Sequence, residues 1–146
     1  MARHRSREHA LQLIFQWDLR PAPHDEILQG YYGSLLVGDD AVAPPRTDPF
    51  AEALFRGVTE NLPAVDTQIT KHAQHWRLER MPAVDRNVLR LAVYEIMFTE
   101  TPPPVVIDEA LELARRFAGD ESVQFVNGVV DAVRRELVPP PAENQH

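Results

Sequence analysis

The sequence predicts an all-α protein, a compact bundle of about seven helices in two packed lobes. Apolar residues recur at intervals of three and four along most of the chain, and no segment alternates apolar and polar residues as a strand would. The prolines and glycines lie mostly at breaks between these segments. With 146 residues, 44% of them hydrophobic, the chain is long enough to bury such a core.

Residues 1–80 are expected to form an N-terminal helical lobe with an arginine-rich arm and an acidic loop at residues 38–48. Its helices are expected at about residues 6–20, 24–37, 49–62 and 63–76. Pro21 ends the first helix, and Asp48-Pro49 gives the third an N-cap carboxylate and a proline at its first position. The residues expected on the inner faces are Ala10, Leu13, Ile14, Trp17, Phe50, Leu54, Val58, Leu62, Val65, Ile69, Ala73 and Trp76.

Residues 81–138 are expected to form a C-terminal helical lobe, and residues 139–146 a disordered polar tail. Its helices are expected at about residues 82–98, 105–118 and 120–137. The apolar face of the first is too broad for a surface helix, so this helix should be central. Asp120 and Glu121 suit the N-terminus of the last helix, where the helix dipole favours negative charge.

The charge and composition exclude several classes of protein. No apolar stretch is long enough to span a bilayer and no secretory signal is evident, so a soluble, cytoplasmic protein is expected. The absence of cysteine excludes disulfides and thiolate catalysis. A net charge of −7 argues against a nucleic-acid partner, but residues 1–20 carry a local charge of +2.

Candidate catalytic and metal-binding groups are few. His72, His75 and Glu79 share one face of a predicted helix, and we interpret them as a solvated polar face rather than a metal site. Asp108, Glu109 and Glu112 are expected to pair with Arg115 and Arg116 on the surface of their helix. No glycine-rich phosphate-binding loop is present. The sequence therefore predicts no catalytic residues, no metal site and no cofactor.

Two other features point to a binding function. Arg3-His4-Arg5-Ser6-Arg7 runs directly into a helix, and arginines beside a helix N-terminus suit a phosphate backbone. Gly128 lies inside the last predicted helix, where glycine costs about 1 kcal/mol relative to alanine. Either it lets another helix pack closely, or it lets a ligand approach, with Gln124 and Asn127 as polar contacts.

Four motifs, in this order and spacing, resemble the NusB family of transcription antitermination factors. They are R-x-R-x-R-E-x-A-L-Q-L-I-F-Q-W at residues 3–17, D-R-N-V-L-R-L-A-V-Y-E-I at 85–96, V-I-D-E-A-L-E-L-A-R-R-F at 106–117 and F-V-N-G-V-V-D at 125–131. The resemblance covers about residues 3–137. It implies an all-helical RNA-binding protein that is not an enzyme.

The resemblance also implies partners and binding residues. Members of the family pair with NusE, a small-subunit ribosomal protein, and the pair binds the boxA element of nascent RNA. The bound pair helps RNA polymerase read through terminators, notably in ribosomal RNA operons. The implied RNA-binding residues are Arg3, His4, Arg5, Arg7, Glu121, Gln124, Phe125 and Asn127, and the implied NusE-binding residues are Asp85 and Arg86. Phe125 could stack on a base or pack in the core.

Two alternatives compete with an antitermination factor. One is a helical protein-interaction scaffold that self-associates and has no direct role with RNA; some members of the family form homodimers. The other is an RNA-binding domain like that of ribosomal RNA methyltransferases. For that second alternative, the residues after Leu137 are expected to be too few for a catalytic domain.

Overall fold

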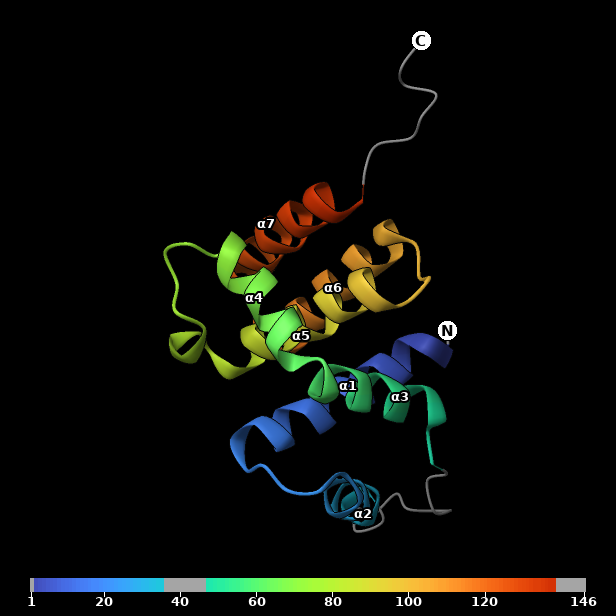
Figure 1. Ribbon diagram of the computed structural model, residues 1–146. Helices are drawn as coiled ribbons and strands as arrows, with labels where there is room; N and C mark the ends of the chain where they lie inside the picture. Colours follow the sequence, from blue (N-terminus) through green and yellow to red (C-terminus); the bar gives the residue numbers. More distant parts are fainter. Residues whose placement is uncertain (1, 36–46, 139–146) are drawn as a thin grey trace. The chain divides into compact units, whose positions relative to one another are not determined.

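The computed structural model describes residues 2–35 and 47–138, and within these ranges it contains helices and no strand (Figure 1). The α-helices are α1 (Ala2–Leu19), α2 (His24–Leu35), α3 (Pro49–Glu60), α4 (Leu62–His72), α5 (Ala83–Phe98), α6 (Pro103–Phe117) and α7 (Asp120–Leu137). A short 3-10 helix, η1 (Leu78–Arg80), precedes α5. The all-α prediction is therefore confirmed. None of the described helices has the length and apolar character needed to cross a membrane.

The chain divides into two compact units, residues 1–59 and residues 60–146. This division falls before α4, whereas the sequence places the lobe boundary at residue 80. The physical reason is that α4 packs on α5 and α7, so it belongs with the C-terminal helices. Most of the acidic loop expected at residues 38–48 and all of the tail at residues 139–146 lie outside the described residues.

In the first unit, Asp48 joins the starts of α1 and α3. Its Oδ1 accepts hydrogen bonds from the backbone N–H of Ala51 (3.1 Å) and from Ser6 Oγ (3.0 Å). Its Oδ2 lies 2.9 Å from Nδ1 of His9, and its own N–H donates to the Tyr32 hydroxyl at 2.8 Å. The predicted N-cap is confirmed; the carboxylate of Asp48 also holds α1 at the start of α3, and its backbone N–H holds α2 there.

Helix α1 begins earlier than expected and includes the arginine-rich segment. Residues 3–7 form its first turns rather than an extended arm. The predicted inner residues Ala10, Leu13 and Ile14 are fully buried. The three arginines are consequently fixed at helical spacing, and their burial differs with the side of the helix they occupy.

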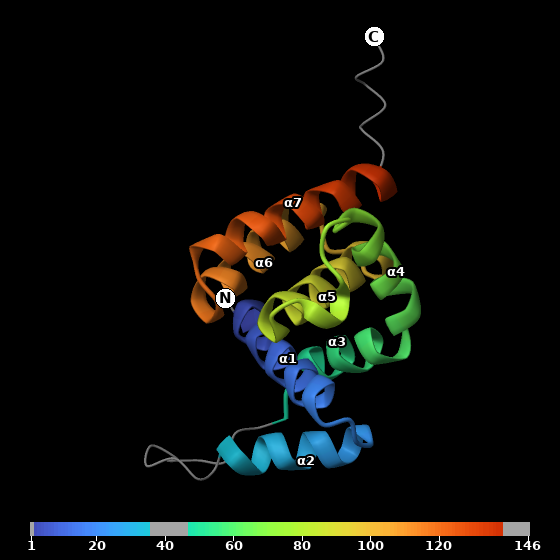
Figure 2. The same cartoon turned by 90° about the vertical axis from the view of Figure 1, so that its left-hand side faces the viewer.

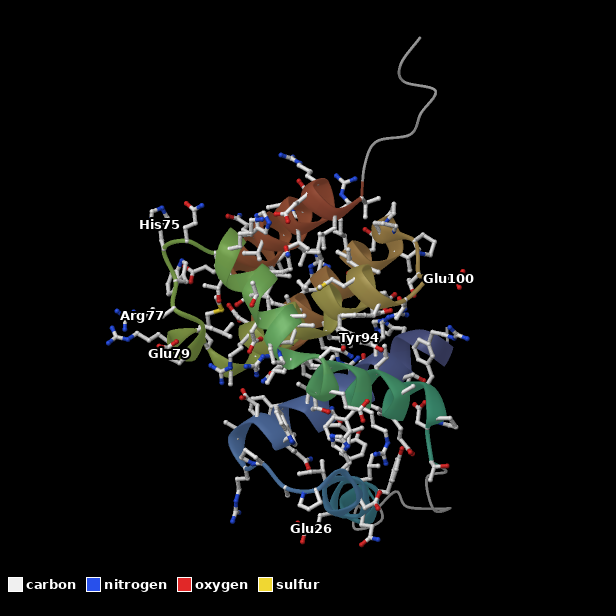
Figure 3. The ribbon with its side chains drawn as sticks, viewed as in Figure 1. Glu26, His75, Arg77, Glu79, Tyr94 and Glu100 are labelled. Carbon is white, nitrogen blue, oxygen red and sulfur yellow. The ribbon has the colours of Figure 1, made fainter. Side chains whose placement is uncertain are left out.

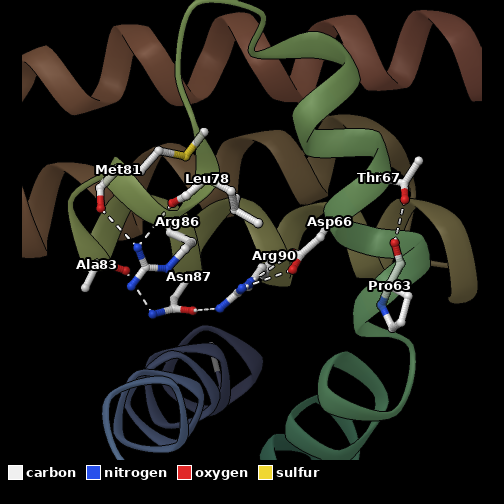
Figure 4. Close-up of polar contacts among 9 residues, drawn as sticks. All are labelled: Pro63, Asp66, Thr67, Leu78, Met81, Ala83, Arg86, Asn87 and Arg90. Atoms are coloured by element: carbon white, nitrogen blue, oxygen red, sulfur yellow. Dashed lines mark hydrogen bonds and ion pairs between the residues drawn. The ribbon is translucent and has the colours of Figure 1, made fainter.

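In the second unit, α5, α6 and α7 pack against one another, and α4 covers α5 and α7 (Figures 1 and 2). Helix α5 buries most of its residues from Asp85 to Glu95, which confirms its predicted central position. Its Arg90 guanidinium donates from Nε and Nη2 to both carboxylate oxygens of Asp66 on α4, at 2.9 and 3.0 Å (Figure 4). Asn87 accepts a further hydrogen bond from Arg90 at 3.1 Å. This paired contact fixes α4 on α5.

Helices α4 and α6 also differ from the sequence predictions, each at one boundary. Helix α4 ends at His72 instead of continuing to residue 76, and Trp76, expected on its inner face, is 52% exposed. The apolar stripe of α4 is already buried through Val65, Ile69 and Ala73, so no interior surface remains for the tryptophan. Helix α6 begins inside the proline run, at Pro103, because the first turn of a helix needs no N–H donor from these residues.

Asp48→Ala is expected to lower the free energy of unfolding by about 1–2 kcal/mol at neutral pH, the usual cost of a lost N-cap. Burial raises the pKa of Asp48, but hydrogen bonds from Ala51, His9 and Ser6 outweigh burial and hold that pKa below its ordinary 3.8. The carboxylate therefore stabilises the fold fully above its ordinary pKa and loses this effect as the pH falls through the lowered value.

Urea denaturation of the wild-type chain and Asp48→Ala at a series of pH values measures this effect. The difference between their unfolding free energies should shrink below about pH 4. A difference that stays constant into strong acid would show that the Asp48 charge does not stabilise the fold.

Candidate nucleic-acid interface

The arginines of α1 differ in how accessible they are. The Arg3 guanidinium lies 4.2 Å from the ring centroid of Phe50 on α3, and Arg3 is exposed. Arg7, one turn later, lies 5.4 Å from the same ring and is only 4% exposed. Arg5 is exposed. Stacking on an aromatic ring leaves the N–H edge of Arg3 available, so Arg3 and Arg5 are the arginines that can meet a phosphate.

His4 is a weaker candidate than the arginines for contact with RNA. Its Nε2 lies 3.2 Å from Oε2 of Glu8, one turn along α1, and the His4 side chain is 34% exposed. Because this imidazole already faces the carboxylate of Glu8, a phosphate would have to compete with that carboxylate for it. The first turns of α1 therefore present chiefly two cations.

The start of α7 forms a second candidate surface, in the second unit. Gly119 precedes the helix with φ of +141°, a conformation that favours glycine, and the chain turns there from α6 into α7. The Ser122 hydroxyl then donates a hydrogen bond of 2.7 Å to Oδ1 of Asp85, which is 6% exposed on α5. This contact sets the beginning of α7 against the beginning of α5.

Beside this contact lies a hollow of about 210 Å³, which we call the α7 hollow. It is lined by Trp76, Pro82, Asp85, Glu121, Ser122 and Phe125. The rings of Trp76 and Phe125 meet edge to face, with centroids 5.7 Å apart and an angle of 61° between their planes. Phe125 is half-buried against the exposed Trp76, so its ring borders the hollow. An apolar hollow bordered by two aromatic rings suits a flat aromatic ligand.

The exposed side of α7 continues from the hollow. Glu121, Gln124 and Asn127, which the resemblance implies bind RNA, are all exposed there. Gly128 is exposed too, and a Cβ atom added to it would meet none of the described atoms within 4 Å. The prediction that Gly128 lets another helix pack closely is therefore wrong for the described part of the chain. Its alternative, approach of a ligand, stays a prediction.

The sequence reasoning missed Trp76, which it placed on the inner face of a longer helix. No local signal distinguishes it, because Trp76 continues the apolar spacing of Ile69 and Ala73, although α4 ends at His72. The reasoning also treated Arg7 as equivalent to Arg3 and Arg5. Only the tertiary contact with Phe50 separates these arginines.

The residues implied to bind a protein partner already hold parts of this chain. Asp85 is engaged by Ser122, and Nη1 of Arg86 donates to the backbone oxygens of Leu78 (3.2 Å) and Met81 (3.1 Å) (Figure 4). Arg86 thereby closes the turn around η1. Neither residue projects as a free side chain from the surface of α5.

His72, His75 and Glu79 do not share a helix face as predicted. Helix α4 ends at His72, so His75 and Glu79 lie on the following connection, where both point outward (Figure 3). His72 Nε2 instead lies 2.8 Å from Oε1 of Glu136 on α7. Hydrogen bonds from Lys71 and His72 hold the pKa of Glu136 below its ordinary value. No group of three potential metal ligands occurs among the described residues.

On the surface of α6, Arg115 pairs with Glu112, as expected.

Comparisons with known proteins agree with the resemblance. The model of the NusB family matches residues 4–135. The transcription antitermination protein NusB of Solibacter usitatus (strain Ellin6076) is 56% identical over 141 residues, which are 97% of this chain and 94% of that protein. The structure of T. maritima NusB is 35% identical with a TM-score of 0.77, covering 94% of this chain and 93% of its own.

A second similar structure contains a complex. It is a crystal structure of the antitermination factors NusB and NusE with double-stranded RNA, and its matching chain is 27% identical with a TM-score of 0.76. The match covers 93% of this chain and 99% of the other.

Ser122→Ala is expected to lower the free energy of unfolding by about 1–3 kcal/mol, because it leaves the buried Asp85 carboxylate without this donor. Urea denaturation monitored by circular dichroism measures the loss. Glu121→Gln, a change to the exposed neighbouring side chain, should stay within about 0.5 kcal/mol of the wild type and serves as control. Equal stability of all three proteins would contradict the hydrogen bond between α5 and α7.

Proposed function

The chain belongs to the NusB family, and from this membership we propose that it is an RNA-binding transcription antitermination factor that acts with NusE. The observation that carries the RNA-binding role is the α7 hollow, with Trp76 and Phe125 at its border and the polar side chains of α7 beside it. Unstacked RNA bases are recognised by such aromatic side chains. The role is one of binding rather than catalysis.

The proposed RNA contacts fall into two kinds. Arg3 and Arg5, on the first turns of α1, supply cations for the phosphate backbone. Phe125, with Gln124 and Asn127 on α7, supplies a stacking surface and polar groups for base edges. Gly128 then leaves room for the RNA backbone close to the helix.

The charge of the chain supports a requirement for a partner. The two accessible arginines of α1 neutralise few phosphates, and the net charge of −7 opposes RNA at longer range. A basic ribosomal protein such as NusE would be attracted by that acidic charge and would add cations of its own. We propose that the RNA is the boxA element of nascent ribosomal transcripts in the cytoplasm, and that the complex promotes read-through by RNA polymerase.

The contact of Asp85 and Arg86 with NusE stays a prediction. Both side chains also make hydrogen bonds within this chain, Asp85 with Ser122 and Arg86 with the backbone oxygen of Leu78.

We expect this chain to bind boxA-containing RNA weakly alone and at least tenfold more tightly with NusE, because the partner supplies cations that α1 lacks. Fluorescence anisotropy of labelled boxA RNA, titrated with this chain in the presence and absence of NusE, measures the difference. A sequence-scrambled RNA is the control. Equal affinities with and without NusE would contradict a cooperative role, and no binding in either titration would favour a scaffold that does not bind RNA directly.

Arg5→Ala is expected to reduce the dependence of RNA affinity on salt by roughly 0.7 in the slope of log K against log salt, the effect of one lost single-strand phosphate contact. Arg7→Ala should leave this slope unchanged and lower the stability instead, because Arg7 is buried beside Phe50.

Arg135→Ala provides a control with the same change of charge, since the Arg135 side chain is 75% exposed near the end of α7. The measurement is RNA affinity with NusE over a series of salt concentrations. If the slope of log K against log salt falls equally for Arg5→Ala and Arg135→Ala, the effect comes from net charge and not from a phosphate contact of Arg5.

A further inference from the structure

We infer that Asp85 makes the α7 hollow selective for an RNA base that presents N–H donors, with guanine preferred and uracil disfavoured. This inference rests on the proposed RNA-binding function and adds a base preference to the same surface.

The position of the Asp85 carboxylate carries the argument. Asp85 is 6% exposed, yet it lines the hollow. Its Oδ1 is held by the Ser122 hydroxyl at 2.7 Å, which fixes the carboxylate between α5 and α7. An ionised carboxylate only accepts hydrogen bonds, and its oxygens have lone pairs beyond the one that Ser122 uses. A ligand in the hollow must therefore offer donors at this point.

The walls of the hollow determine the class of ligand. Trp76, Pro82 and Phe125 form apolar walls, and the Trp76–Phe125 pair presents ring surface to whatever enters. The carboxylates of Asp85 and Glu121 exclude a phosphate by repulsion of like charge. A metal ion would gain nothing from the apolar walls. A nucleobase fits both features, because it combines a flat aromatic face with an edge of polar groups.

The four bases differ at that edge. Guanine presents two adjacent donors, N1–H and the N2 amino group, which match a carboxylate in geometry. Adenine and cytosine each present one amino group beside an acceptor nitrogen. Uracil presents a single N–H between two carbonyl oxygens, which a carboxylate repels. Guanine should therefore bind most tightly in the hollow and uracil least, since an unmatched buried polar group costs free energy.

The test compares guanosine with inosine, which lacks only the N2 amino group. Short uridine-rich RNAs carrying one guanosine, or inosine in its place, are titrated against this chain with NusE in a buffer free of divalent cations. The wild-type complex should bind the guanosine RNA roughly tenfold more tightly, the value of one hydrogen bond to a charged group. Asp85→Asn should bind the two RNAs almost equally.

A charge-matched control separates base selection from general electrostatics. Glu26→Gln removes one negative charge from the exposed surface of α2, outside the second unit (Figure 3). It should raise the affinity for both RNAs alike and keep the tenfold ratio. Trp76→Ala should lower the affinity for both RNAs, because it removes a wall of the hollow and leaves the Asp85 carboxylate, which selects the donor edge, in place. Circular dichroism checks that each variant is folded, and Asp85→Ala replaces Asp85→Asn if the latter is not.

The outcomes are distinguishable. Equal binding of guanosine and inosine RNA by the wild-type complex overturns the inference and leaves the proposed function standing. A tenfold ratio that survives in Asp85→Asn also overturns it. If Asp85→Asn weakens capture of NusE while the ratio persists, Asp85 acts on the protein partner instead. If the wild-type complex binds boxA-containing RNA but neither of these RNAs, the inference is overturned. If it binds none of the three, the proposed function itself fails.

Discussion

Helix α5 buries charged and amide side chains, and the second unit is arranged so that they have partners. An unpaired charge in the interior costs several kcal/mol, so each such side chain fixes a neighbour in place. Arg90 holds Asp66 of α4, and Asp85 holds Ser122 of α7. At the other end of α5, Oε1 of the buried Glu95 accepts a hydrogen bond of 3.2 Å from the Thr101 hydroxyl. These contacts fix the register of α5 against its neighbours. Hydrophobic packing alone would leave that register adjustable.

The α7 hollow is a consequence of that arrangement. Arg90 positions α4 on α5, and the chain leaves α4 at His72 to place Trp76 beside the start of α7. Gly119 turns the chain into α7 in a conformation that other residues rarely adopt, and Ser122 then fixes its first turn on α5. The candidate site thus lies where separate parts of the chain are held by polar contacts. Such contacts specify geometry more sharply than apolar ones.

The sequence predicts the helices and most of their buried faces, because these depend on local periodicity and on prolines. The N-cap at Asp48 is equally local, and it is confirmed. Three other features could not be predicted, because they do not depend on local sequence. Trp76 continues the apolar spacing of α4, yet that helix ends first; Arg7 is buried beside Phe50, which is distant in sequence; and Gly128 faces open space. Each depends on tertiary neighbours, which periodicity does not reveal.

An acidic protein can bind RNA when the contacts that position the RNA and those that read it lie on different residues. Phosphate contacts supply affinity without sequence information, whereas base contacts supply specificity. In this chain the cations proposed to contact phosphates lie on the first turns of α1, and the α7 hollow contains carboxylates that would repel a phosphate. The same carboxylates favour the donor edge of a base. The acidity that weakens RNA binding as a whole therefore becomes, at Asp85, a means of choosing which base the hollow accepts.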